Sequence, residues 1–168
     1  MNLLANLKEI KNYFLKKENI YYSALIIIIF FFDRYSKFIV INNFSETAQY
    51  INKYLNLDLI WNIGIGFGFL STESSLTYNL ITFLIGVVIL YLVYVFALAE
   101  KIDKLIFSII IGGALGNFYD RLVYKAVPDF IDLHHNNFHW FTFNVADIFI
   151  TVGILIFIIR SFFIKNLR

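Results

Sequence analysis

Long apolar stretches separated by shorter polar segments are the main feature of this sequence. Four of them are about long enough for a helix that crosses a bilayer, which takes about 20 residues. They cover residues 21–41, 77–98, 104–119 and 145–163. The third is short but can extend if the Lys104 side chain reaches toward the interface. The pattern predicts an all-α membrane protein with four transmembrane helices in a single membrane-embedded domain, residues 1–168.

The polar segment 42–76, between the first two stretches, is too long for a simple turn. Within it, residues 54–69 (YLNLDLIWNIGIGFGF) alternate in polarity and are rich in β-branched, aromatic and Gly residues, which predicts strands. Non-helical backbone beside a membrane is stable where protein covers it or where it lines a wet cavity. We therefore expect a small sheet that rests on the helical bundle.

Basic residues are concentrated in the segments that would share one side of the membrane. Nine of the 14 Lys and Arg residues are on this side: Lys8, Lys11, Lys16, Lys17, Lys101, Lys104, Arg160, Lys165 and Arg168. The opposite loops, 42–76 and 120–144, hold only Lys53, Arg121 and Lys125. The excess of positive charge on cytoplasmic loops predicts that both termini are cytoplasmic and that these two loops are extracytoplasmic.

Composition excludes several classes of function. Hydrophobic residues make up 60% of the chain, which is not typical of a soluble domain. The net charge of +2 is too small to indicate a nucleic-acid partner. The absence of Cys excludes disulfides, thiolate catalysis and Cys-based zinc sites.

Acidic side chains at the predicted membrane edge are the best candidates for chemistry, because a carboxylate near hydrocarbon is costly and usually functional. Asp147 opens the fourth stretch, and Asp129 precedes it on the same predicted side. Two carboxyls that come together can share a proton and divide acid and base roles. Asp147 could instead be only a helix cap, three residues after Asn144. From the residues alone, Asp120 and Asp129 are both possible partners of Asp147.

Other polar residues have plainer interpretations. Asp33 and Lys37 are four residues apart on one helix face, which favours an internal ion pair over direct catalysis. Asp120 beside Arg121 suggests a structural pair, although Arg121 could hold a peptide carbonyl or a lipid ester. The small residues of 112–116 favour close helix packing.

The sequence Asn62-Ile-Gly64-Ile-Gly66-Phe-Gly68 resembles a dinucleotide-binding loop only superficially. Its third Gly comes one residue too early and no βαβ unit surrounds it. A strand or bulge fits better, in which Asn62 either binds a substrate backbone or stabilises a turn.

The segment 120–144 also contains residue types that bind metals. These are Asp129, Asp132, His134, His135 and His139. Because no HExxH or other matched ligand spacing occurs, a polar loop at the membrane surface is favoured. Neither a metal nor another cofactor is expected.

Five segments together resemble the lipoprotein signal peptidases, also called signal peptidase II. They are Asp33-Arg-Tyr-Ser-Lys37, Asn62-Ile-Gly64, Gly112-Gly-Ala-Leu-Gly-Asn117-Phe-Tyr-Asp120-Arg121, Val127-Pro-Asp129-Phe130 and Phe143-Asn144-Val-Ala146-Asp147. They occur in the order and at the spacing of that family. Gly66, where the family usually has Ala or Ser, and Pro128, in place of the commoner Val, are departures that remove no polar group.

The resemblance implies a membrane aspartyl endopeptidase that removes the signal peptide from bacterial prolipoproteins, cleaving before a Cys that carries diacylglycerol. It implies that Asp129 and Asp147 are catalytic and that other residues support the site or the substrate. These are Asp33, Lys37, Asn62, Gly64, Asn117, Asp120, Arg121, Asn144 and Ala146.

The same resemblance implies a place in the inner membrane, with the active site at the outer leaflet under a β-cradle and a short periplasmic helix. The expected partners are lipid-modified prolipoproteins and membrane lipid, and the expected state is a monomer. The alternative is a non-enzymatic bundle, such as a proton-coupled transporter or a lipid-binding protein, which would take up or bind its ligand without proteolysis.

Overall fold

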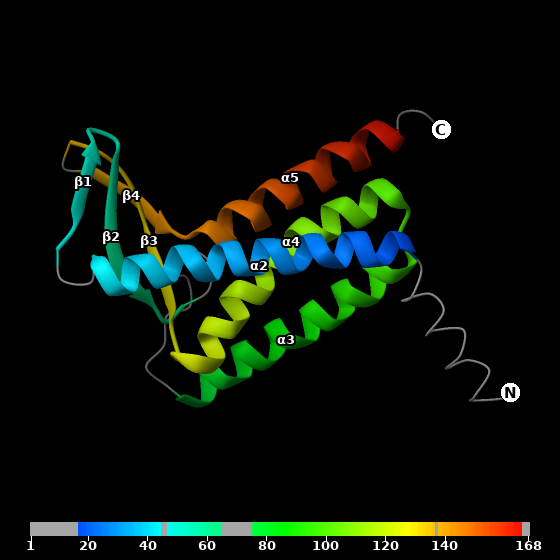
Figure 1. Cartoon of the computed structure of the whole chain (residues 1–168), viewed down its shortest axis with the longest axis horizontal. Coiled ribbons are helices and arrows are strands. Elements are labelled where there is room, and N and C mark those ends of the chain that lie inside the picture. The colour runs from blue at the N-terminus through cyan, green and yellow to red at the C-terminus, as the bar shows by residue number, and fades with distance from the viewer. Residues whose placement is uncertain (1–16, 45–46, 65–74, 137, 166–168) are drawn as a thin grey trace, which may run out of the picture.

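The computed structural model describes residues 17–44, 47–64, 75–136 and 138–165. Its helices run side by side, and its strands form a sheet beyond one end of them (Figure 1). The helices are α2 (Lys17–Asn43), α3 (Ser75–Leu98), α4 (Lys101–Val123) and α5 (Val145–Lys165). Each predicted span corresponds to one of these helices. Helix α4 extends beyond the predicted third span, 104–119, at both ends, and its Asn117 and Asp120 are buried.

Helix α4 is the centre of the bundle and packs against each of the other three helices. Glycines permit this close approach, as the 112–116 pattern predicted. A Cβ added to Gly112 would lie 2.8 Å from Ile29 of α2, and one added to Gly113 would lie 2.6 Å from the carbonyl oxygen of Ala146 in α5. Any side chain at these positions would push α2 or α5 away from α4.

Three helices in the described part of the chain are long and apolar enough to cross a membrane: Leu76–Leu98, Lys101–Val123 and Val145–Phe163. This confirms the apolar helical architecture of a multi-pass membrane protein. Helix α2 is not among the three, and it carries Asp33, Arg34 and Lys37. Asp33 and Lys37 are fully buried, whereas Phe31 and Phe38 are each 63% exposed. Because α2 is not among the three candidate spans, a fourth span formed by this helix stays a prediction.

The sheet has four antiparallel strands in the order β1-β2-β3-β4. These are β1 (Gln49–Asn52), β2 (Leu55–Asn62), β3 (Val127–His135) and β4 (Phe138–Phe143). The strand predicted in the first loop is confirmed by β2, whereas the interpretation of the histidine-containing part of 120–144 as a polar loop is wrong. Most of that segment forms the β3–β4 hairpin, whose pairing with β2 buries Val127 through Phe130.

The sheet lies at the bundle end where α2 ends and where α3 and α5 begin (Figure 1). The expected short helix of the first loop does not fall within 47–64, and the rest of that loop, including Gly66, lies largely outside the described residues. Strand β3 follows α4 directly, and α5 follows β4. The chain thus places polar residues of α4, β3 and α5 at a common boundary between bundle and sheet.

Candidate active site

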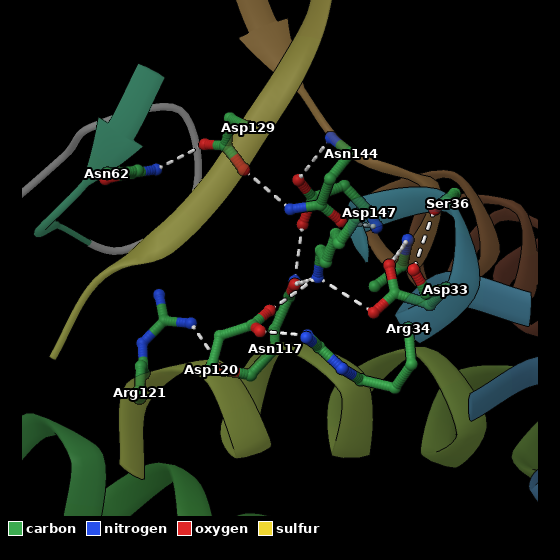
Figure 2. Close-up of polar contacts among 12 residues, drawn as sticks. Asp33, Arg34, Ser36, Asn62, Asn117, Asp120, Arg121, Asp129, Asn144 and Asp147 are labelled. Carbon is green, nitrogen blue, oxygen red and sulfur yellow. Dashed lines mark hydrogen bonds and ion pairs between the residues drawn. The ribbon is translucent and has the colours of Figure 1, made fainter. Parts of the chain in front are cut away.

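Asp129 lies on β3, where it is 3% exposed. Asn62, the last residue of β2, donates from its Nδ2 to Asp129 Oδ2 at 2.8 Å. Asn144, between β4 and α5, donates from its Nδ2 to Oδ1 at 2.6 Å (Figure 2). Both oxygens of this buried carboxyl group therefore accept a hydrogen bond from an amide.

Asp147 lies in the first turn of α5 and forms a reciprocal cap with Asn144. The Asp147 N–H donates to Asn144 Oδ1 at 3.0 Å, and the Asn144 N–H donates to Asp147 Oδ2 at 3.2 Å. This is the geometry of a capping box, so the cap interpretation of Asp147 is confirmed. The other oxygen, Oδ1, accepts from Asn117 Nδ2 of α4 at 2.8 Å. Capping thus holds Asp147 in a position where α4 also contacts it.

The three Asn side chains around these acids are each oriented by a group that can only donate. The donors are the Gly64 N–H for Asn62, Lys37 Nζ for Asn117 and the Asp147 N–H for Asn144, at 2.8, 2.8 and 3.0 Å. A backbone N–H or an ammonium must meet the carbonyl oxygen of the amide. The NH₂ groups therefore face the carboxyls of Asp129 and Asp147, and each amide orientation is determined by its own contacts.

A buried ion cluster supports this arrangement from α2. Lys37 Nζ lies 2.8 Å from Asp33 Oδ2 and 2.7 Å from Asp120 Oδ2, and all three side chains are completely buried. The internal ion pair predicted between Asp33 and Lys37 is confirmed. The remaining oxygen of Asp33 accepts the Ala146 N–H of α5 at 2.9 Å. The cluster therefore joins α2, α4 and α5 below the two aspartates (Figure 2).

Asp120 is bonded to α2, and the predicted structural pair with Arg121 is wrong. Asp120 Oδ1 pairs with Arg34 and Oδ2 pairs with Lys37. Adjacent residues of a helix point in different directions, which separates Asp120 from Arg121. With both oxygens held by cations, Asp120 is unsuited to exchange protons with Asp147. Sequence analysis missed Arg34, although a charged residue within an apolar run was a signal of a buried partner.

Arg121 lies on the side of α4 that faces the end of β2. Its Nη2 donates to the Gly64 carbonyl oxygen at 2.8 Å, and its Nη1 donates to the Asn117 carbonyl oxygen at 3.2 Å. Arg121 thus connects α4 to the turn that follows β2. Asn62 stabilises the same turn through the Gly64 N–H, so the turn interpretation of Asn62 is confirmed.

The electrostatics of Asp129 are unusual for an aspartate. Burial, followed by the nearby charge of Asp147, raises the pKa of Asp129 to about 6. Hydrogen bonds from Asn62 and Asn144 and the charge of Lys37 oppose this rise in pKa. Asp129 consequently retains its proton to a much higher pH than an exposed Asp would. Such a pair can hold one proton between two carboxyls, which suits general acid–base chemistry.

The histidines of 120–144 do not belong to this site. His134 and His135 end β3, and His139 lies on β4. Asp132 is their neighbour on β3, three residues beyond Asp129. These residues are on paired strands and not on a polar loop. The turn between the two strands includes Asn136, where φ is 55°.

Comparisons with a family profile and with individual proteins all indicate the same family. A profile of the signal peptidase (SPase) II family matches residues 25–163. A lipoprotein signal peptidase of Pelagibacter ubique is 46% identical over 160 residues, covering 94% of this chain and 93% of its own. One from Francisella tularensis subsp. novicida is 39% identical over 140 residues, covering 80% and 86% of the two chains.

Two solved structures described as bacterial membrane enzymes share the fold. One has a TM-score of 0.70 and 28% identity, covering 84% of this chain and 87% of its own. The other has a TM-score of 0.69 and 27% identity, covering 83% and 91%. The family profile spans nearly all of the helices and the whole sheet, and the resemblance found in the sequence motifs is confirmed. The chain belongs to the signal peptidase II family.

Proposed function

We propose that Asp129 and Asp147 are the catalytic dyad with which this chain hydrolyses its substrate. As a member of the signal peptidase II family, the protein is a membrane protease that removes signal peptides from prolipoproteins. The observation that carries the dyad is the position of Asn144, which bonds to both aspartates at once. Asp120, the other possible partner of Asp147, has both oxygens engaged by cations.

The proposed reaction begins with one proton on the pair, and we assign it to Asp129. The Asp147 carboxylate takes a proton from water while the water oxygen attacks the scissile carbonyl carbon. Asp129 gives its proton to the carbonyl oxygen, which forms a tetrahedral diol. Asp147 then protonates the departing amine nitrogen as the C–N bond breaks, and Asp129 takes back a proton from the diol. The pair ends as it began, and neither a metal nor a covalent intermediate is required.

The proposed role of the supporting residues is to position the two aspartates. Asn62 and Asn144 hold Asp129, whereas Asn117 and Asn144 hold Asp147. The role proposed for the ion cluster of Asp33, Lys37 and Asp120 is to fix α2, α4 and α5 relative to one another. Gly64 and Ala146 contribute backbone atoms, and Arg121 aligns the turn after β2. We also propose that Arg121 or Asn62 contacts a carbonyl of the bound peptide.

The proposed substrate is a prolipoprotein whose Cys already carries diacylglycerol, with cleavage just before that Cys. The site at the boundary between an apolar bundle and a sheet supports this choice (Figure 1). The lipid can remain in the bilayer while the peptide reaches the polar residues. The distribution of basic residues supports cytoplasmic termini and a site at the outer leaflet of the inner membrane. We further propose that α2 is the fourth span and that the protein acts as a monomer.

The deciding experiment is cleavage of a diacylglyceryl-modified precursor peptide by the purified chain in detergent. Asp129→Asn and Asp147→Asn should each lower kcat by at least about 1,000-fold, because no acid–base pair remains. Asp58→Asn, on β2, is the matched control and should retain activity. Substantial cleavage by either dyad variant would overturn the assignment. Binding of the peptide by the wild type without a shortened product would favour the transporter or lipid-binding alternative.

A further inference from the structure

A second group of polar side chains lies on the sheet, away from the aspartates proposed to be catalytic. Asp132 and His134 alternate along β3, and His139 of β4 is the cross-strand partner of His134. Residues two apart on a strand and residues directly opposite on its neighbour share one face of a sheet. Asp132 is three residues beyond Asp129, so strand alternation directs its side chain to the opposite face. These three side chains form what we call the histidine cluster.

The histidine cluster brings potential ligand atoms close together. Asp132 Oδ2 lies 2.8 Å from His139 Nδ1 and 3.6 Å from His134 Nδ1. One ligand atom from each of the three residues falls within 4.8 Å of the others. Tetrahedral zinc with bonds of about 2.1 Å separates its ligand atoms by roughly 3.4 Å. The observed separations are close to that value, and the exposed His139 side chain can adjust.

Buried polar atoms without partners give the cluster its second indication. Asp132 Oδ1 and His134 Nδ1 are buried and form no hydrogen bond with the described residues. The two residues are 3% and 6% exposed, so water does not reach them freely. Asn56, which pairs with Asp132 across β2 and β3, has a buried Oδ1 in the same condition. Leaving such a group unsatisfied costs about 1–3 kcal/mol. Three unsatisfied polar atoms on one face of a sheet therefore indicate a bound ligand.

We propose that Asp132, His134 and His139 bind a divalent transition-metal ion of the zinc class. Two imidazole nitrogens and a carboxylate favour zinc over Mg²⁺ or Ca²⁺, which prefer oxygen ligands alone. Asn56 Oδ1 lies on the same face and can supply a fourth ligand. The ion would join β3 to β4 and satisfy the unpaired atoms of the cluster. This site is independent of the proposed peptidase reaction, since none of its residues contacts the two catalytic aspartates.

The test is direct titration with Zn²⁺ of the full chain, expressed without a histidine tag, purified in detergent and stripped with chelator. Calorimetry should give one Zn²⁺ per chain, and Co²⁺ should give the visible absorption of a tetrahedral site. His139→Ala and Asp132→Asn should each weaken Zn²⁺ binding by at least about tenfold. Zn²⁺ should also raise the Tm of the wild type but not that of His139→Ala.

The chain has its own control for this experiment. Of the chain's 3 histidines, His135 is the one outside the histidine cluster; it follows His134 on the strand, so it faces the other side of the sheet. His135→Ala should bind Zn²⁺ as the wild type does. The proposal fails if the wild type binds no Zn²⁺, if His139→Ala and Asp132→Asn bind it equally well, or if Ca²⁺ binds as tightly. Each result is read from metal binding, so loss of peptidase activity does not affect it.

Discussion

Asn144 Nδ2 lies 2.6 Å from Asp129 Oδ1, which connects the first turn of a helix to a buried strand. Asn144 is also the residue before α5, and its Oδ1 accepts the Asp147 N–H. The Asn144 side-chain amide therefore caps α5 through the Asp147 N–H and donates to the carboxyl of Asp129, which lies 18 residues before Asp147 in the sequence. Asn144 thus belongs both to the cap of α5 and to the proposed catalytic site, and a suitable substitution can separate its two contributions.

Asn144→Ser should remove the hydrogen bond to Asp129 and keep the cap of α5. Serine is a good N-cap, so the stability of α5 should change little, but its short side chain cannot reach Asp129. We expect kcat to fall about 100-fold while Tm stays near the wild-type value. Asn144→Ala should lose the link and also about 1 kcal/mol of stability. Equal activity of Asn144→Ser and the wild type would show that the link to Asp129 is dispensable.

Asn117→Ala should impair catalysis more than substrate binding. It removes the hydrogen bond to Asp147 Oδ1, while Lys37 keeps its two carboxylate partners. We expect kcat to fall by about 10- to 100-fold with a small change in KM. Ser108→Ala is the control, since Ser108 is a buried polar residue of α4 whose hydroxyl donates only within that helix. A large rise in KM with unchanged kcat would instead assign Asn117 to substrate binding.

Lys37→Met should destabilise the bundle. The substitution leaves Asp33 buried without a cation, while Asp120 keeps Arg34. Removing one partner of a buried ion pair typically costs about 3–5 kcal/mol. Thermal unfolding in detergent should therefore show a large fall in Tm. The double variant Lys37→Met/Asp33→Asn should recover part of the loss, because it removes the uncompensated charge; no recovery would show that packing dominates.

The activity should decrease as the pH rises through about 6. Asp129 has a pKa raised to about 6, so it donates a proton below this pH and loses that proton above it. The charged groups that act on it are Asp147 of α5, which raises its pKa, and Lys37 of α2, which lowers it. The measurement is kcat/KM from about pH 4 to about pH 8, which reports ionisation of the free enzyme.

Asn62→Ala provides the matched control for the pH profile. The Asn62 hydrogen bond lowers the pKa of Asp129, so its loss should move the alkaline limb to higher pH. Asp58→Asn on the same strand should leave the limb in place. A wild-type profile that stays flat from about pH 5 to about pH 8 would contradict the assignment of the proton to Asp129.

Gly113→Ala should separate α4 from α5. The added Cβ would lie 2.6 Å from the Ala146 carbonyl oxygen, which is backbone and cannot move alone. Overpacking typically costs about 1–3 kcal/mol, and here it also displaces the turn that holds Asp147. We expect lower Tm and at least tenfold lower kcat. Gly86→Ala is the control, because its Cβ meets only the Phe118 ring, at 3.1 Å.

Local patterns in the sequence were sufficient for much of the fold. The apolar stretches predicted each helix, because burial of a continuous apolar surface and helical spacing are properties of neighbouring residues. The pair Asp33–Lys37 and the cap at Asn144 and Asp147 were also visible, since residues three or four apart meet on a helix. The β3–β4 hairpin was not predicted, because most of β3 is buried on both faces and its sequence lacks the polar–apolar alternation of a strand with one exposed face.

Only the tertiary structure decided which distant groups meet. Asp120 pairs with Arg34 and Lys37, more than 80 residues away, and Asn62 reaches Asp129 across 67 residues. The histidine cluster likewise depends on the register of β3 against β4. These contacts arise from helix packing and strand pairing, which no local spacing encodes. The sequence by itself determined the helices and the candidate acids, and the packing of α4 with β3 and α5 decided which acids share a site.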